Sequence, residues 1–392
     1  MGGRDNVVHG ALVYCMIFLL SIGIVFVGFL GLLLSSDTFH LHLQVTDKEP
    51  QVPCYFIFGD SLADDGNNND LPTLAKSNYP PYGVDFPEGP TGRFTDGRLI
   101  VDIIAQLLGF HGFIPPFANL KGADILKGVN YASAASGIRD ESGSQMGQVI
   151  SMNKQLSNHF AIVSRIAQIM KSYSAANRYL GKCVYTVITG NNDYINNYFM
   201  PEVYPTSRIY TPQQFADVLA KEYSDQLQTL YSFGARKVAV FSAGQIGITP
   251  EMIARFGANS SASIDAVVQL FNDQLPSLVG NLNSQLSGAE FILIDTSDVS
   301  IDTDGVNVAD TCCPTVPELG TCVPGSVPCS NRSEYVFFDG FHTTEVVNEA
   351  YAKVAYEEMS LFYNASAYGG VGGISRPAPS WLWNQRVGYS PY

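Results

Sequence analysis

The chain has 392 residues, of which 46% are hydrophobic and 15% charged, and its formal net charge is −14. This length and apolar content suffice for one large domain or two smaller ones, and they exclude a chain that is disordered throughout. The acidic balance leaves no basic stripe to meet phosphate groups, so we expect no nucleic acid among the partners.

The chain begins with a long uncharged segment. Residues 10–34 carry no charged side chain, and Arg4 is the only Lys or Arg before them. The segment exceeds both the about 7–15 apolar residues of a typical signal-peptide core and the about 20 that span a bilayer. We therefore expect residues 1–36 to be a signal peptide or an uncleaved signal anchor, followed by a linker over 37–51. The rest of the chain is then exported, and a membrane is a partner only if the anchor is retained.

Two further features agree with export. Asn-x-Ser triplets at Asn259, Asn331 and Asn364 are candidate acceptors for N-linked glycans. Outside the apolar segment the cysteines are even in number, as expected for disulfides, namely Cys54, Cys183, Cys312, Cys313, Cys322 and Cys329. The last four lie among Pro and Gly without the two paired clusters of a zinc site, so they predict a disulfide-bonded loop of open connectivity.

Five short apolar runs, each bounded by turn residues, predict the strands of a sheet. Their apolarity is continuous rather than alternating, which is typical of parallel strands covered on both faces. Helical patterns lie between several of them, so the order of elements predicts a doubly wound α/β domain. The runs cover residues 55–58, 129–132, 184–189, 237–241 and 291–294.

Three helices are predicted among these runs. The first begins at a capping box formed by Thr211 and Gln214 and ends at Gly234. A second covers roughly residues 264–286, and a third follows His342. No internal repeat or strong linker interrupts the pattern, so one domain follows the N-terminal segment.

Small and polar residues gather where three of the predicted strands end. Ser61 follows the first run, residues 133–138 follow the second, and Asn192 follows the third. Ligands of open parallel sheets bind beyond the carboxyl ends of the strands. Backbone N–H groups and an asparagine amide at this edge are suited to surround the negative charge that develops on an oxygen during acyl transfer.

A serine nucleophile needs a base, and histidine is scarce. Beyond the N-terminal stretch the chain has only His111, His159 and His342. We expect His159 on a surface helix and His111 at a helix end. His342 comes three residues after Asp339, close enough for one loop to carry both, and a carboxylate there can fix the tautomer of the imidazole. His342 is therefore the favoured base.

These motifs resemble, in order, the conserved blocks of the plant GDSL esterase/lipases, within the SGNH hydrolases. The likeness spans residues 52–365 and leaves 366–392 as a C-terminal tail. It implies an α/β fold, a flavodoxin-like three-layer α/β/α sandwich with a mainly parallel five-stranded sheet, and it implies no cofactor. The matching blocks are Gly59–Asn69, Tyr79–Gly83, Gly92–Arg98, Gly128–Ser133, Gly190–Asp193 and Asp339–His342.

The resemblance also implies roles for single residues. Ser61 is then the nucleophile and His342 the base, which Asp339 orients, while Gly137 and Asn192 join the backbone N–H of Ser61 in an oxyanion hole. The implied activity is hydrolysis of carboxylic esters (lipid, acyl or O-acetyl) through an acyl-enzyme. The implied substrate is a small-molecule, lipid or acylated glycan ester, met outside the cell in the wall or apoplast.

Two other functions stay open. An acyltransferase acting on wall polysaccharide or cutin-type substrates would use the same residues. A non-catalytic wall or carbohydrate-binding protein would not need Ser61, Asp339 and His342, all of which are intact.

Two local expectations complete the sequence-based picture. The acidic run from Asp64 to Asp70 lacks the calcium-loop spacing because Ala63 stands at a ligand position, so we predict a turn and no metal site. Cys54 and Cys183 precede two predicted strands by similar margins, and we predict that they pair.

Overall fold

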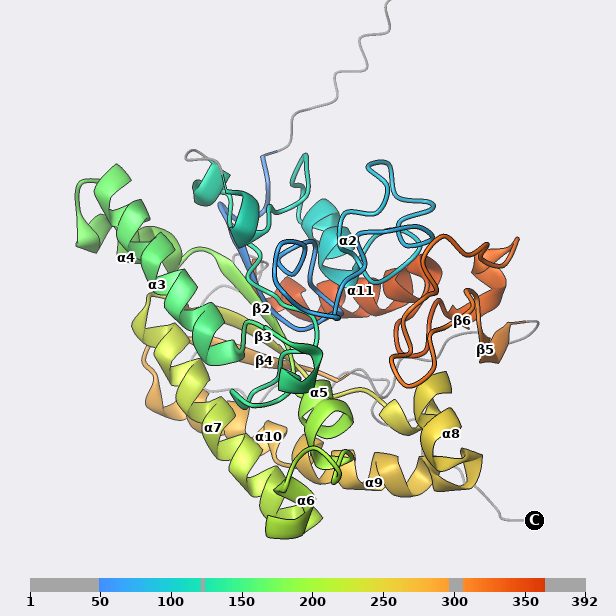
Figure 1. Ribbon diagram of the computed structural model, residues 1–392. Coiled ribbons are helices and arrows are strands. Elements are labelled where there is room, and N and C mark those ends of the chain that lie inside the picture. The colour runs from blue at the N-terminus through green and yellow to red at the C-terminus, as the bar shows by residue number, and fades with distance from the viewer. Residues whose placement is uncertain (1–48, 121–123, 296–305, 364–392) are drawn as a thin grey trace, which may run out of the picture. The chain divides into compact units, whose positions relative to one another are not determined.

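The computed structural model describes residues 49–120, 124–295 and 306–363 (Figure 1). The predicted signal segment, most of the linker, Asn364 and the C-terminal tail lie outside these ranges. Within the described residues, no helix is long and apolar enough to cross a membrane.

Four parallel strands form the central sheet, in the order β1-β2-β3-β4. Every residue of β1 and β2 is buried, which explains why their sequences are continuously apolar. All four coincide with predicted runs. The strands are β1 (Tyr55–Gly59), β2 (Val184–Ile188), β3 (Lys237–Phe241) and β4 (Glu290–Ile294).

The remaining predicted run, residues 129–132, lies along the other edge of β1 without being a full strand. The N–H of Ile57 donates to the Val129 carbonyl at 3.1 Å, and the N–H of Tyr131 donates to the Ile57 carbonyl at 2.8 Å. The second run in sequence thus flanks the first, as in the doubly wound order of flavodoxin-like sheets. The predicted fold class is confirmed.

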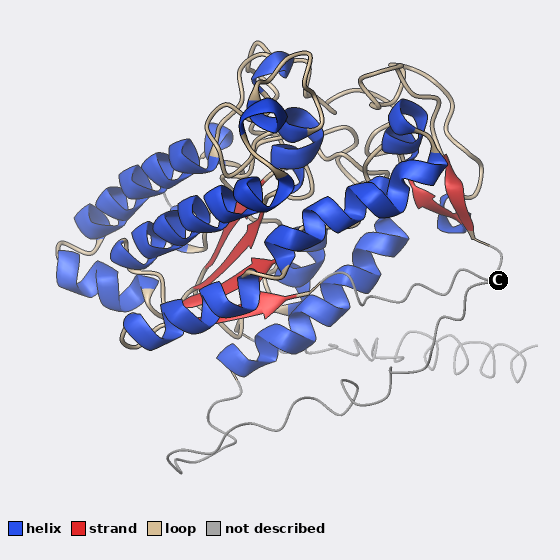
Figure 2. Ribbon diagram, turned by 90° about the horizontal axis from the view of Figure 1, so that it is seen from below, coloured by secondary structure: helices blue, strands red, loops and turns tan. Residues whose placement is uncertain are grey.

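Helices cover both faces of the sheet, because successive strand side chains point to opposite sides. Phe56 and Phe58 pack in one hydrophobic cluster, and Tyr55 and Ile57 pack in another. The first cluster lies under α3 (Met152–Ile169), α4 (Tyr173–Leu180), α7 (Pro212–Ser232), α9 (Ser261–Asn272) and α10 (Leu275–Gln285), and the second under α2 (Ile100–Leu107) and α11 (Glu345–Met359). Figures 1 and 2 show these helices on the two sides of the sheet.

The predicted helices are present, with one correction. α7 begins with the predicted capping box between Thr211 and Gln214. The helix predicted over residues 264–286 is instead two helices, α9 and α10, with a break at Asp273 and Gln274. Pro276 stands in the first turn of α10 and has no N–H to bond the Asn272 carbonyl, which favours a new helix start over a continuous helix at this point.

Shorter elements lie mostly in the connections at the carboxyl edge of the sheet. They are α5 (Asn191–Asp193), α6 (Thr206–Ile209), α8 (Pro250–Phe256), the parallel pair β5 (Asn307–Thr311) and β6 (Tyr335–Phe337), the π-helical turn η4 (Tyr194–Tyr198), and the 3-10 turns η1 (Phe117–Asn119), η2 (Asp124–Leu126), η3 (Ser144–Met146), η5 (Ile246–Ile248), η6 (Ala258–Ser260), η7 (Arg332–Glu334) and η8 (Ser360–Phe362).

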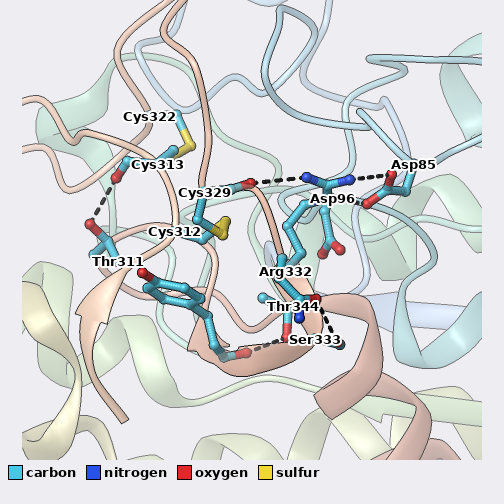
Figure 3. Close-up of a disulfide and its surroundings, with 12 residues drawn as sticks. Asp85, Asp96, Thr311, Cys312, Cys313, Cys322, Cys329, Arg332, Ser333 and Thr344 are labelled. Atoms are coloured by element: carbon cyan, nitrogen blue, oxygen red, sulfur yellow. Dashed lines mark hydrogen bonds and ion pairs between the residues drawn. A yellow bond between two sulfur atoms is a disulfide. The ribbon is translucent and has the colours of Figure 1, made fainter. Parts of the chain in front are cut away.

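Three disulfides join the six described cysteines. Cys54 pairs with Cys183, as predicted, and so links the starts of β1 and β2. The other two bonds, Cys312–Cys329 and Cys313–Cys322, close the segment that precedes β6. Figure 3 shows this region, where Arg332 donates to the Cys329 carbonyl and pairs with Asp85.

Candidate active site

Ser61 lies in the turn that follows β1. The turn passes so close to β2 that a Cβ on Gly59 would lie 2.2 Å from the Ile188 carbonyl oxygen, and Gly59 also has a φ of +151°. Only glycine suits this position. The Asp60 carbonyl accepts the N–H groups of Ala63 and Asp64, which reverses the chain and places Ser61 at the tip.

The structure brings Ser61, His342 and Asp339 together from distant parts of the chain. Nε2 of His342 lies 2.7 Å from the Ser61 Oγ, and Nδ1 lies 2.8 Å from both Asp339 carboxylate oxygens. Asp339 is fully buried and His342 is 7% exposed. With its Nδ1 proton held by a carboxylate, the imidazole presents a free Nε2 that can accept the serine proton.

Tyr82 is a further part of this site. Its hydroxyl donates to Oδ2 of Asp339 at 2.6 Å and accepts the N–H of Cys322 at 3.0 Å. Burial and the neighbouring Asp339 raise the pKa of Tyr82 well above its usual value, so it stays a donor. The sequence placed Tyr82 in a matching block but gave no sign of this contact, since the two residues are 257 positions apart.

Asn192 and the segment 134–137 lie beside Ser61. Asn192 lines the same cavity as Ser61, and its Nδ2 donates to the Ser136 carbonyl at 3.1 Å, which leaves a second N–H on that nitrogen. Ala134 and Ala135 also line the cavity, whereas Gly137 does not: a Cβ on it would meet the Asp193 carboxylate at 2.5 Å.

Several N–H groups are available near the serine. Among the described residues, the backbone N–H groups of Ser61, Ala135 and Gly137 have no hydrogen-bond acceptor. Ala135 has a φ of +64°, an unusual conformation for a residue with a Cβ. An oxyanion site can thus draw on this segment, and Gly137 stays a prediction.

The acidic run after Ser61 forms a turn bonded to the backbone. Oδ1 of Asp64 accepts the N–H groups of Gly66 and Asn67, and Oδ2 accepts the N–H of Ala134 at 2.8 Å. Asp64 therefore ties the turn that carries Ser61 to the segment 134–137. In the described part of the chain, no cluster of three His, Cys, Asp or Glu residues could hold a metal ion.

Two buried carboxyl groups, Asp60 and Asp193, adjoin Ser61 and Asn192 in the chain. Burial raises the pKa of Asp60 to about 7, against the opposing effects of the Leu62 N–H and of His342. Burial also raises the pKa of Asp193 to about 6, although its oxygens accept N–H groups from Ile138 and Arg139. These groups gain or lose a proton near neutral pH and contribute to the local field.

His159 is not on the surface, and that prediction is wrong. It is fully buried under β1, with ring contacts to Phe56 and Phe58, and its Nδ1 lies 3.0 Å from the Tyr131 hydroxyl. Burial lowers its pKa to about 3. Since His111 is exposed, His342 alone of the three lies beside Ser61.

A cavity of about 390 Å³ opens beside Ser61 and His342. Its polar lining includes Asn192, Asn196 and Gln145 and also the charged residues Arg255 and Glu318. Apolar side chains form most of the remaining wall, among them Leu62, Ile100, Ile188, Ile195, Met200, Phe241, Phe337 and Phe341. Such a wall suits an apolar group next to a reacting carbonyl.

Two of the three candidate glycan acceptors lie among the described residues. Asn259 and Asn331 are both exposed, and Asn364 lies outside the described residues. Glycosylation of the three stays a prediction.

Comparison with known proteins agrees with these observations. The family model for GDSL-like lipases/acylhydrolases matches residues 55–355. One GDSL esterase/lipase of Arabidopsis thaliana is 46% identical over 320 residues, which cover 79% of this chain and 88% of that relative. A second from the same plant is 45% identical over 318 residues, covering 78% and 88%. These names favour ester hydrolysis and give no specific support to acyl transfer.

Proposed function

Because the chain belongs to the GDSL-like lipase/acylhydrolase family and is a serine ester hydrolase, we propose that Ser61 is its nucleophile. His342 is the general base, and Asp339 holds the imidazole. The observation that carries this assignment is the 2.7 Å contact between Nε2 of His342 and Oγ of Ser61. A nucleophile and base within this distance, with the base oriented by a carboxylate, form the arrangement that acyl transfer requires.

The reaction proceeds in two halves. His342 Nε2 takes the Ser61 hydroxyl proton while Oγ attacks the ester carbonyl, and the proton passes to the leaving alcohol as the tetrahedral intermediate collapses. Water then attacks the acyl-enzyme. His342 takes a proton from this water and returns it to Ser61 Oγ as the carboxylic acid leaves.

The oxyanion is held by the Ser61 N–H and the Asn192 Nδ2, with a third N–H from the segment 134–137, for which Gly137 is the predicted donor. Support comes from the place of Asn192 on the cavity wall and from the available N–H groups near Ser61. Donors fixed by the fold stabilise the developing charge without reorganisation during the reaction.

We further propose that the substrate carries an apolar acyl chain, because apolar side chains form most of the cavity wall. Each buried methylene contributes about 0.8 kcal/mol, or about fourfold in kcat/KM. A series of nitrophenyl esters from acetyl to palmitoyl, assayed beside acetylated sugars, should show kcat/KM rising with chain length to a plateau. A preference for acetyl esters would contradict this proposal.

Ser61→Ala is the direct test of the nucleophile. We expect kcat to fall by roughly 10³-fold or more with little change in melting temperature, because only the attacking atom is removed. Ser157→Ala, an exposed serine on α3, is the matched control. A serine-reactive phosphonate should label the peptide that carries Ser61. Full activity in Ser61→Ala, or label on another serine, would refute the assignment.

We propose export as well. Three disulfides in the described residues agree with an oxidising compartment. Comparing the mass of the mature protein with that of the full chain distinguishes a cleaved signal from a retained anchor. A reduced protein recovered in the cytosol would contradict export.

A further inference from the structure

The side chain of Asn192 has two chemically different ends. Its Nδ2 can donate to an oxyanion, whereas its Oδ1 would repel one, so the direction of the amide decides whether the residue helps or hinders the reaction. The carbonyl of Ser136 accepts from Nδ2 at 3.1 Å and favours the useful direction from one side. A second contact fixes the other end.

Asn196 supplies that contact. Its Nδ2 donates to Oδ1 of Asn192 at 2.6 Å, so the Asn192 oxygen is occupied on the side away from Ser136. Asn196 stands in the π-helical turn Tyr194–Tyr198, with non-helical φ and ψ of −112° and 29°. Irregular turns of this kind are frequent at functional sites because they redirect a side chain.

Asn196 is itself oriented by two residues further from Ser61. Its Oδ1 accepts from Nε2 of Gln145 at 2.8 Å, and Oε1 of Gln145 accepts from the hydroxyl of Tyr204, which is buried. The backbone N–H of Gln145 donates back to the Tyr204 oxygen at 3.2 Å. Each amide therefore accepts at its oxygen and donates at its nitrogen, in one direction, from Tyr204 to Asn192. Hydrogen bonds aligned in this way polarise and strengthen one another.

We propose that Asn196, oriented by Gln145 and Tyr204, is a positioning residue that sets the amide direction of Asn192 and keeps its N–H aimed at the oxyanion. This inference rests on the proposed function, because it presumes that Asn192 is an oxyanion donor. It assigns no contact with substrate to Asn196.

Asn196→Asp tests the proposal by replacing a single atom, the Nδ2 that donates to Asn192, with an oxygen. The carboxylate has no proton to donate and would face Oδ1 of Asn192, so that amide turns its nitrogen toward Asp and its oxygen toward the reacting centre. We expect kcat to fall about 10²–10³-fold, as on loss of one oxyanion donor, with KM changed less than about threefold. A raised KM with unchanged kcat would overturn the proposal.

The double variant shows whether Asn196 acts through Asn192. In an Asn192→Ala background, Asn196→Asp should cause no further loss, because there is no amide left to turn. An equal loss in both backgrounds would overturn the proposal. Full activity of Asn192→Ala alone would refute the oxyanion assignment, whereas loss in Asn192→Ala with full activity in Asn196→Asp would refute the positioning inference alone.

Gln145→Glu gives a second test. Gln145 contacts Asn196 and reaches Asn192 only through it. Glu accepts from Tyr204 but cannot donate to Asn196, so it favours the reversed direction of both asparagines. We expect kcat to fall between about tenfold and the full effect of losing one donor, again without a matching change in KM. Gln148→Glu, on an exposed side chain of the same loop, makes the same chemical change and should keep full activity. Equal behaviour of the two glutamate variants would overturn the proposal.

Discussion

At the scale of single residues, Tyr82 connects Asp339, the carboxylate of the proposed triad, to a disulfide-bonded segment. Its hydroxyl bridges Oδ2 of Asp339 and the N–H of Cys322, while the nearby Tyr79 donates to the Cys322 carbonyl. The two tyrosines thus hold the same segment, but only one of them touches Asp339.

Replacing each tyrosine by Phe distinguishes the effect of losing the hydrogen bond to Asp339 from the effect of loosening the Cys322 segment. We expect Tyr82→Phe to lower kcat about tenfold at nearly unchanged KM, because a hydrogen bond to a charged group contributes about 1.5–3 kcal/mol. Tyr79→Phe loosens the Cys322 segment but removes no hydrogen bond to Asp339, so it should leave kcat within about twofold. Steady-state kinetics on both variants decides this. Equal losses in the two would mean that Tyr82 acts only through the segment.

The residues of the proposed triad could be predicted from the sequence, whereas the residues that orient the site, Tyr82 and Asn196, could not. Ser61 follows a strand, and Asp339 and His342 share one short loop, so local sequence carries their signal. Tyr82 and Asn196 act through contacts that only the tertiary structure reveals. The position of His159 does have a local signal, because it falls on the same helical stripe as the buried Gln155, Leu156, Ile162 and Ile166, and this spacing indicates a core position.

At the scale of elements, the start of α11 is fixed to the loop before α2. Glu345 accepts the backbone N–H of Arg98 at 2.6 Å, and its own N–H donates to Asp96 at 2.7 Å. Between them, Gly97 lies so close that a Cβ would stand 1.8 Å from a Glu345 carboxylate oxygen. His342, the proposed base, precedes this junction by three residues, so we expect the packing of α2 against α11 to help position it.

Gly97→Ala should therefore disturb both stability and activity. We expect a loss of about 1–3 kcal/mol in unfolding free energy, because the Cβ forces Glu345 from its partners, and a lower kcat. Gly280→Ala is the matched control, since Gly280 is an exposed glycine of α10 with no atom within 4 Å of the added Cβ. That change should stabilise by about 0.5–1 kcal/mol. Denaturant titrations give the unfolding free energy of each variant. An unchanged unfolding free energy in Gly97→Ala would contradict the close approach of Gly97 to Glu345.

The elements themselves were predictable where a local rule decided them. Continuous apolar runs located the four strands of the central sheet, and the capping box located the start of α7. The run at 129–132 pairs with β1 for only a few residues, which no local pattern distinguishes from a full strand. The division of α9 from α10 did have a signal, since Pro276 lies inside the predicted helix.

At the scale of the whole molecule, the buried His159 links stability to pH. Its folded pKa is about 3 against an ordinary value of 6.5, so between these values the unfolded chain binds a proton that the folded chain does not. The stabilisation is fully present above pH 6.5 and is lost as pH falls toward 3. Asp64 and Asp193, whose pKa values burial raises to about 6, have the opposite effect: the folded state binds their protons more tightly, so they favour folding as pH falls through that value.

His159→Gln isolates the histidine from these opposing groups. The variant should be less stable than the native protein at pH 7.5, and the difference should shrink by about 1.4 kcal/mol per pH unit below 6.5 because Gln does not titrate. Unfolding free energies of both proteins at several values between pH 7.5 and 4.5 give the comparison. A difference independent of pH would show that His159 can be protonated in the folded state.

The contact between Ser61 and His342 joins residues 281 positions apart, and this separation has a consequence for biosynthesis. Ser61, the proposed nucleophile, follows the first described strand, and His342, its proposed base, precedes α11. A nascent chain therefore leaves the ribosome with Ser61 unpaired and chemically silent while every strand of the central sheet is synthesised. Esterase activity can arise only after His342 has been made, so a chain truncated before Asp339 would carry an intact serine and no base to activate it.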